Sequence, residues 1–304
     1  MKNIGFSPLT AAIVVVVILA AGAGAYFLTR GPAGGTPQGG SGEPQNGEEN
    51  QGQGPFPNSP YYHRVYSATS SDGVNWVVDN TLLLDHASVP GAVYFNNKVY
   101  LYFVNASDWQ NEKLSVAISQ DRGATFTVQN VQITGSNSPY PVDPHPIVDN
   151  GKIRLTYFGN FMQGETGKMV TATSSDGINF TDERVLITGN FTDPDLFYDD
   201  VRGEWVLFLS PTMTKATAPS ITSTFTTDQS FSWNGSVSST HKIGNKYYTY
   251  YIESGAIAVA EYSNGALTSV ASRILNYSGL NADPSVVTFG ANDYKMFFKT
   301  QVGA

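Results

Sequence analysis

The chain of 304 residues contains no cysteine, so no disulfide framework holds it together and its stability must come from a packed core. Charged residues are also scarce, at 14% of the chain, and 25 acidic against 17 basic residues give a formal net charge of −8. A protein of this charge is repelled by phosphate backbones. The sequence therefore argues against a nucleic-acid partner.

Long hydrophobic runs are absent except at the N-terminus. Residues 10–29, TAAIVVVVILAAGAGAYFLT, are uncharged and mostly apolar, and they lie between Lys2 and Arg30. About 20 such residues suffice for a helix to cross a bilayer. We expect residues 1–30 to form one transmembrane helix that anchors the protein in the cell membrane, with the rest of the chain on the extracellular side.

Two other interpretations of this N-terminal segment stay open. The small residues of AGAGA offer sites for signal-peptide cleavage, which would give a secreted protein. The sequence KNIG before FSPLT resembles the processing site of archaeal pilin-like signals. Residues 31–56 are rich in Gly, Pro, Gln and Glu without an apolar pattern, which predicts a flexible linker to a globular domain at 57–304.

A phrase of about 20 residues recurs five times in the globular domain. Each copy has a short strand pattern, a polar turn and a longer aromatic-rich strand, and the copies occupy 87–104, 142–159, 191–210, 236–253 and 281–300. The equivalent positions, spaced 54, 50, 44 and 46 residues apart, are Pro90, Pro144, Pro194, Ser238 and Pro284. This spacing is typical of propeller blades.

The second half of each unit is a strand-turn-strand segment, as in SVAISQDRGATF (115–126) and VTATSSDGINF (170–180). The copy missing after the fifth phrase stands at the front of the domain, as RVYSATSSDGVNW (64–76). The sequence thus predicts an all-β fold, a five-bladed β-propeller that is closed by pairing the N-terminal strands with the C-terminal blade. Sustained helical periodicity is absent beyond the anchor, so helices should be nearly absent.

Aspartates precede proline at the predicted starts of three innermost strands, namely Asp143, Asp193 and Asp283, whereas Val89 and Val237 take this place in the other two. Innermost strands line the channel of a propeller, so the three carboxylates should converge at one mouth. The SxDxG turns should lie on the opposite face, where a carboxylate ties the turn together.

These motifs resemble a superfamily of five-bladed glycosidases that includes family 43 arabinanases and xylosidases and family 32 invertases. VDPHPIV and ADPSVV resemble the family 43 motif whose Asp is the base of an inverting mechanism, and TDPDLF resembles a further site that orients substrate or tunes the pKa of the acid. The resemblance implies that Asp143 is the base and Asp193 the orienting group, with Asp283 as a substitute. SQDRGATF resembles the Asp-box of sialidase-type propellers.

The same family needs a glutamic acid as proton donor, commonly in a Glu-Gly-Pro context that this chain lacks. Glu253, in the tight turn YIESG on the expected face, is the best candidate, whereas Glu112 and Glu165 stand in polar loops typical of solvated surface. Residues expected to bind the sugar are aromatic, imidazole or carboxylate side chains near the same mouth: Trp109, Tyr140, Phe161, His86, His145, His241 and Asp195. We expect no metal and no cofactor.

The sequence supports two functions from different classes. The first is an exported glycoside hydrolase-like propeller that acts on an oligo- or polysaccharide, and the second is a non-catalytic carbohydrate-binding or adhesive propeller on the cell surface. The absent Glu-Gly-Pro favours the second. A sialidase would need an arginine cluster, but Arg122 and Arg202 fall in turns of the opposite face.

Overall fold

The computed structural model describes residues 55–136, 141–159 and 166–302. In these ranges the only helix is the short 3-10 turn η2 (Pro60–Tyr62), and every other regular element is a strand. The predicted anchor lies outside the described residues, as does the linker up to residue 54. None of the described segments forms a helix long and apolar enough to cross a membrane.

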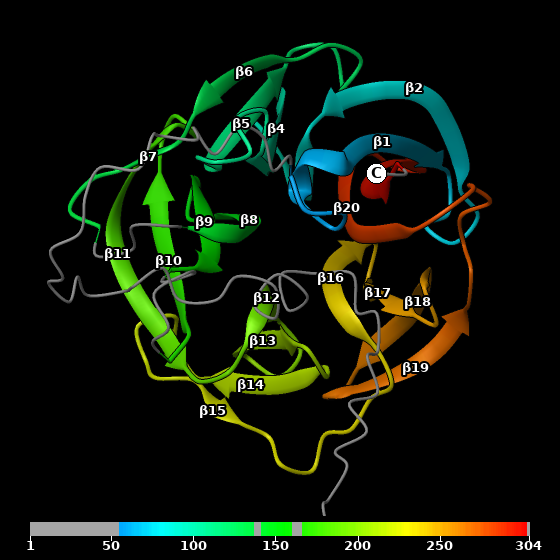
Figure 1. Cartoon of the computed structure of the whole chain (residues 1–304). Coiled ribbons are helices and arrows are strands. Elements are labelled where there is room, and N and C mark those ends of the chain that lie inside the picture. Colours follow the sequence, from blue (N-terminus) through cyan, green and yellow to red (C-terminus); the bar gives the residue numbers. More distant parts are fainter. Residues whose placement is uncertain (1–54, 137–140, 160–165, 303–304) are drawn as a thin grey trace, which may run out of the picture.

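Five mainly antiparallel sheets stand as blades around a common central axis (Figure 1). Blade 1 comprises β3 (Ala87–Phe95), β4 (Lys98–Asn105), β5 (Lys113–Ser119) and β6 (Thr127–Asn130). Blade 2 comprises β8 (Val142–Asp149), β9 (Lys152–Phe158), β10 (Lys168–Ser174) and β11 (Asn179–Thr188), with β7 (Gln132–Ile133) added in parallel at its outer edge. Blade 3 comprises β12 (Thr192–Asp199), β13 (Glu204–Ser210), β14 (Thr214–Ala218) and β15 (Thr226–Thr227). Blade 4 comprises β16 (Ser236–Ile243), β17 (Lys246–Glu253), β18 (Ala256–Ser263) and β19 (Ala266–Ala271).

Blade 5 combines the two ends of the described chain. It comprises β20 (Asn281–Gly290), β21 (Asp293–Gln301), β1 (His63–Ser70) and β2 (Val77–Asp85). Strand β1 pairs with β21 over its whole length, from His63 opposite Gln301 to Ser70 opposite Tyr294. The predicted five-bladed fold and its mode of closure are both confirmed. Closure pairs strand edges that would otherwise be open.

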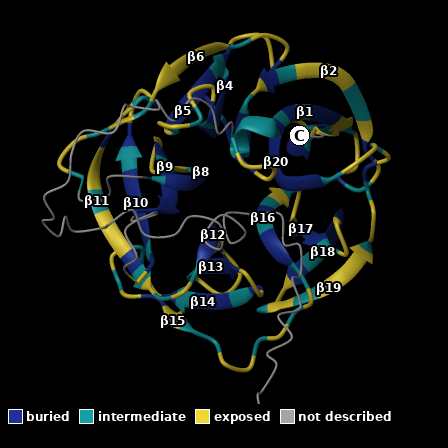
Figure 2. Cartoon of the chain, in the orientation of Figure 1, coloured by how far each residue is buried: buried dark blue, intermediate teal, exposed yellow. Residues whose placement is uncertain are grey.

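The core lies between neighbouring blades rather than at one centre. Between blades 1 and 2, for example, Tyr102, Tyr157 and Phe180 are fully buried in one cluster, and the Tyr102 hydroxyl donates to the Gly177 carbonyl over 2.9 Å. Burial falls from the inner to the outer strands, and β2, β6, β11 and β19 carry most of the exposed strand surface (Figure 2). This gradient explains why the inner repeats are apolar and aromatic and the outer ones are not.

Each innermost strand contains the same bulge near its start. The register shifts between Ser88 and Gly91 in blade 1, and the other four blades repeat the shift at the equivalent place. One residue in each bulge has a positive φ, with 50° at Val89, 55° at Asp143, 48° at Asp193, 50° at Val237 and 50° at Asp283. This region costs an L-residue roughly 1–2 kcal/mol, and a β-branched valine is especially unsuited to it. Because valine adopts it too, the bulge belongs to the repeat and is not caused by the aspartates.

The SxDxG turns lie at the other end of the blades from these bulges, for example after β1, which ends at Ser70. In the first turn Asp72 Oδ1 accepts hydrogen bonds from the backbone N–H groups of Val74 and Asn75, both over 2.8 Å. Asp176 repeats these two contacts in blade 2. The hydrogen bonds lower the pKa of Asp72, most strongly those from Asn75, so this carboxylate stabilises its turn in the ionised form.

Candidate carboxylate site

The three Asp-Pro aspartates meet at the end of the channel where the innermost strands begin. Asp143, Asp193 and Asp283 line one cavity of about 30 Å³, together with the prolines that follow them. Their exposed fractions are only 2%, 6% and 3%. The backbone N–H of Asp193 donates to Asp143 Oδ2 over 3.4 Å, so adjacent blades place two of these groups in direct contact. The β-bulge near the start of each innermost strand directs these side chains toward the channel.

Each aspartate has a different set of partners. Asp193 Oδ2 accepts from the Thr192 hydroxyl over 2.6 Å. Asp283 Oδ2 lies 2.5 Å from the Nζ atom of Lys299, a lysine that is itself only 1% exposed. No protein hydrogen bond in the described structure reaches the Oδ1 atoms of Asp143 or Asp193. Those two oxygens can therefore accept from water or from a hydroxyl group of a ligand.

Burial and mutual repulsion disfavour ionisation of the cluster. Burial raises the pKa of Asp143 well above its usual value, and the negative charges of Asp193 and Asp283 add to the effect. Burial, followed by the charge of Asp283, raises the pKa of Asp193 to about 6. Burial also raises the pKa of Asp283, and the ammonium group of Lys299 opposes that rise. The cluster thus tends to hold a proton in mildly acidic conditions, and the proton belongs to the group rather than to one residue.

Two residues beside the cluster were not among the candidate site residues of the sequence analysis. Lys299 lies on β21 opposite Ala282, next to Asp283 in the bulge of β20. His63 on β1 is buried, and its Nδ1 lies 2.8 Å from the hydroxyl of Ser88, which precedes Val89 of the blade 1 bulge. Burial, followed by the charge of Lys299, lowers the pKa of His63, so its ring is neutral. The one available signal was a lysine inside the otherwise apolar run MFFKT.

Of the residues expected to bind sugar, only His145 lines this small cavity within the described structure. Its Nε2 donates to the Leu196 carbonyl over 3.1 Å, and His241 lies farther along the channel. Asp195 is fully buried and accepts from both the N–H and the hydroxyl of Thr240, over 2.9 and 2.8 Å. Asp195 therefore joins blade 3 to blade 4 instead of facing the cavity.

The structure does not bring Glu253, Trp109 or His86 into the small cavity. Glu253 is partly exposed at the end of β17, opposite Ala256 in the next strand. Trp109 is partly buried in the loop between β4 and β5. The ring of His86 stacks on that of Tyr61, with 3.9 Å between the centroids. Two further candidates, Tyr140 and Phe161, and also Glu165, lie outside the described residues.

The described residues contain no group of three or more His, Cys, Asp or Glu side chains arranged to hold a metal ion. Lys299 forms an ion pair with one member of the cluster, Asp283.

No protein-family model matches the chain, and no curated protein matches it in sequence. Solved structures do match. A thermostable family 43 glycoside hydrolase superimposes with a TM-score of 0.56 over 71% of this chain and 88% of its own, at 14% identity. The fold is that of family 43 glycoside hydrolases.

Two further structures support the same conclusion. An α-L-arabinofuranosidase from Clostridium thermocellum gives a TM-score of 0.53 over 76% of this chain and 88% of its own, at 14% identity. A family 43 β-xylosidase/α-arabinofuranosidase from a compost microbial metagenome, solved with xylotriose, gives 0.52 over 71% of this chain and 90% of its own, again at 14% identity. The expected resemblance to five-bladed glycosidases is thereby confirmed for the fold.

Proposed function

We propose that the protein is a glycoside hydrolase-like propeller that acts on an oligo- or polysaccharide at the carboxylate cluster. The observation that carries the proposal is the convergence of Asp143, Asp193 and Asp283 in a buried cavity at one end of the channel. Buried, mutually repelling carboxylates are unfavourable for folding, and pairs with raised pKa values are the means by which glycosidases hold a base and an acid together.

In this proposal Asp143 is the general base of an inverting reaction. Its raised pKa makes the ionised carboxylate a stronger base, and its Oδ1 can accept a hydrogen bond from the attacking water. Lys299 holds Asp283 by an ion pair and supplies positive charge to the cluster. Asp193, whose pKa burial raises to about 6, orients the substrate and shares in the proton that the cluster holds.

The second candidate is a carbohydrate-binding or adhesive propeller without catalysis. The specific observation in its favour is the size of the cavity, about 30 Å³, which accommodates roughly two water molecules but not a sugar ring. No glutamate is found among the described residues that line it. Arginine is also missing from that lining, which removes support for a sialidase.

The test compares the full chain with Asp143→Asn on fragments of arabinan, xylan, mannan and fructan. For a hydrolase, turnover should fall by ~10²–10⁴-fold in the variant while sugar affinity changes little, because only water activation is lost. Asp121→Asn is the matched control, since it makes the same change in an exposed turn at the other end of the blades. Its turnover should equal that of the wild type.

The two candidate functions predict different outcomes of this test. Binding without hydrolysis of any of the four sugars would decide for the binding propeller, and Trp109→Ala should then weaken binding by ~1–2 kcal/mol if the indole stacks on the ligand. Hydrolysis that persists in Asp143→Asn would remove the catalytic role of Asp143.

We further propose that the propeller is exported and held at the cell membrane by residues 1–30. Support comes from the hydrophobic run at 10–29 and the Gly- and Pro-rich residues that follow. The full chain should sediment with membranes and be digested by protease added outside intact cells. Recovery of the intact protein from the soluble cell interior would contradict the proposal.

A further inference from the structure

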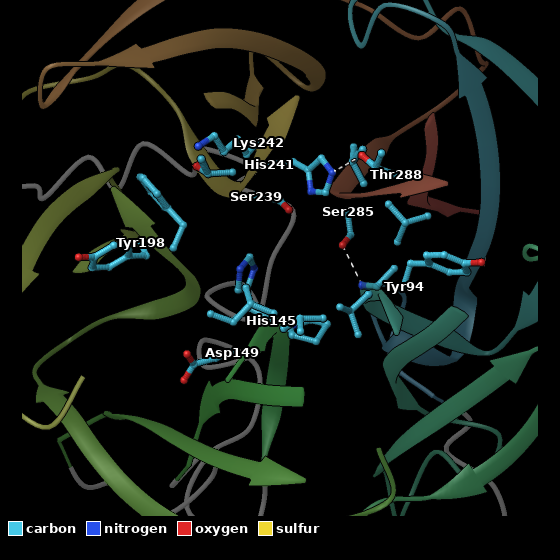
Figure 3. Close-up of a pocket in the computed structure, with 18 of the residues that line it drawn as sticks. Tyr94, His145, Asp149, Tyr198, Ser239, His241, Lys242, Ser285 and Thr288 are labelled. Atoms are coloured by element: carbon cyan, nitrogen blue, oxygen red, sulfur yellow. Dashed lines mark hydrogen bonds between the residues drawn. The ribbon is translucent and has the colours of Figure 1, made fainter. Parts of the chain in front are cut away.

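The channel widens away from the aspartates into a second, much larger cavity, here called the far cavity (Figure 3). Its volume is about 620 Å³, within the usual ~300–1,000 Å³ of small-molecule sites. It is formed by the second halves of the innermost strands, and it meets the small cavity at His145, Ser239 and Ser285, which line both. Its lining consists entirely of described residues.

Aromatic rings stand around the opening of the far cavity. Tyr198 is 44% exposed, and its ring lies 5.4 Å from that of Trp205. Tyr94 lies on the opposite side and packs edge-on against Phe289, with 5.0 Å between ring centroids (Figure 3). A solvent-exposed tyrosine beside a partly buried tryptophan offers an apolar surface with polar atoms at its edge.

The interior of the far cavity is polar without being charged. The hydroxyl of Thr288 lies 2.7 Å from His241 Nε2, and the hydroxyl of Ser239 and the ring of His145 face the same space. Burial, together with the charge of His145, lowers the pKa of His241 to about 4. Burial likewise lowers the pKa of His145. Both rings are therefore neutral at physiological pH. Because His145 Nε2 already donates to Leu196, its other nitrogen can only accept, whereas His241 keeps one ring nitrogen beyond its hydrogen bond with Thr288.

Each of the two charged residues that line the edge of the far cavity, Asp149 and Lys242, is paired with a residue of opposite charge. Asp149 accepts from Arg154 over 2.7 Å, and Lys242 forms an ion pair with Asp200. Little net charge is left to attract an ionic ligand. A ligand that fits this lining is neutral, carries hydroxyl groups and has at least one apolar face.

We propose that the far cavity is a second carbohydrate-binding site, for a neutral sugar, separate from the carboxylate cluster. The ring of Tyr198, with Trp205 behind it, contacts the apolar face of the sugar, and Ser239, His241 and Thr288 meet its hydroxyl groups. The ligand class is shared with the proposed function, but the site needs no catalytic activity from the aspartates. It would hold an end or a branch of a polysaccharide on the face away from the cluster.

The test measures calorimetric binding of xylotriose and of the corresponding trisaccharides from arabinan, mannan and fructan. Asp143→Asn full-length chain serves as the background so that hydrolysis does not consume the probe. Adding Tyr198→Ala should weaken binding of at least one of the four sugars by about tenfold, since an exposed stacking ring is lost. Trp205→Ala should act in the same direction, but Trp205 is partly buried and its variant needs a thermal-unfolding check.

Val201→Ala is the matched control, because Val201 is 75% exposed in the turn that follows Tyr198 and does not line the far cavity. It should leave binding unchanged. The proposal is overturned if none of the four sugars binds, or if a sugar that binds keeps its affinity in both Tyr198→Ala and Trp205→Ala. Failure of the proposed hydrolase function is distinguishable, because it appears as absent turnover in the wild type whatever the far cavity binds.

Discussion

Aspartates occur at both ends of the propeller, and their pKa values are shifted in opposite directions at the two ends. At the starts of the innermost strands, Asp143, Asp193 and Asp283 are buried and burial raises their pKa values. In the SxDxG turns, Asp72 and Asp176 sit near the surface, and hydrogen bonds from neighbouring residues lower their pKa values.

This difference separates residues that serve folding from residues that do not. A turn aspartate is more stable ionised in the folded protein than in the unfolded chain, so its charge contributes to stability. The clustered aspartates are less stable ionised in the folded protein, and each also occupies a strained backbone position. Folding alone gives no reason to keep them, whereas the proposed function does.

The largest effect on this comparison is expected from Lys299→Met. The substitution leaves Asp283 buried without its counter-charge, which typically destabilises a protein by about 3–5 kcal/mol. Chemical denaturation at pH 7 would measure the loss. The double variant Lys299→Met/Asp283→Asn should recover most of it, because no buried charge is then left alone. A loss below about 1 kcal/mol in the single variant would mean that Asp283 is largely protonated in the folded protein and leaves no buried charge behind.

The second effect is a gain in stability from Asp193→Asn. The pKa of Asp193 is about 6 in the folded protein against 3.8 for a free aspartate side chain, so the native state binds the proton more tightly. The stability from this proton is fully present below pH 3.8 and is lost as the pH rises through 6. The variant should therefore exceed the wild type by roughly 2–3 kcal/mol at pH 8 and match it near pH 4. Denaturation curves at both pH values measure this, and a variant less stable at pH 8 would reverse the sign we assign.

The smallest effect is the same substitution at the other end, Asp72→Asn. Because the pKa of Asp72 is lowered in the folded protein, its contribution is present above pH 3.8 and is lost as the pH falls through the folded value. Asp72 is largely solvated, so the loss at pH 7 should stay below ~1 kcal/mol. The variant and the wild type should converge in acid. If Asp72→Asn lowers the free energy of unfolding at pH 8 while Asp193→Asn raises it, the comparison is confirmed. Changes of the same sign in both variants would refute it.

The fold could be predicted because each blade repeats the same phrase and because half a blade stands at the front of the domain. Both signals depend on local pattern and spacing. The common position of Asp143, Asp193 and Asp283 followed from the same alignment of repeats. Sequence spacing alone therefore placed three residues that lie up to 140 positions apart.

The rest of the site could not be predicted, because it depends on the exact register within a blade and on contacts between blades and across the ring closure. Lys299 reaches Asp283 from β21, the neighbouring strand of blade 5. His63 on β1 of blade 5 reaches Ser88 in blade 1. Asp195 resembled a ligand-binding group, but its hydrogen bonds go to Thr240 in the next blade. The far cavity has no motif at all, since it arises from strand ends that converge only in three dimensions.

The bulge has a consequence for how this chain could change. Five equivalent positions share the same backbone conformation, and only three of them hold a carboxylate. Val89 and Val237 stand in the same geometry around the same cavity. A single codon change there would add a functional group to the ring without remodelling the backbone, and the loss of one aspartate would leave the frame intact. The propeller thus has five equivalent bulge positions, and a carboxylate could be gained at one blade and lost at another without a change of fold.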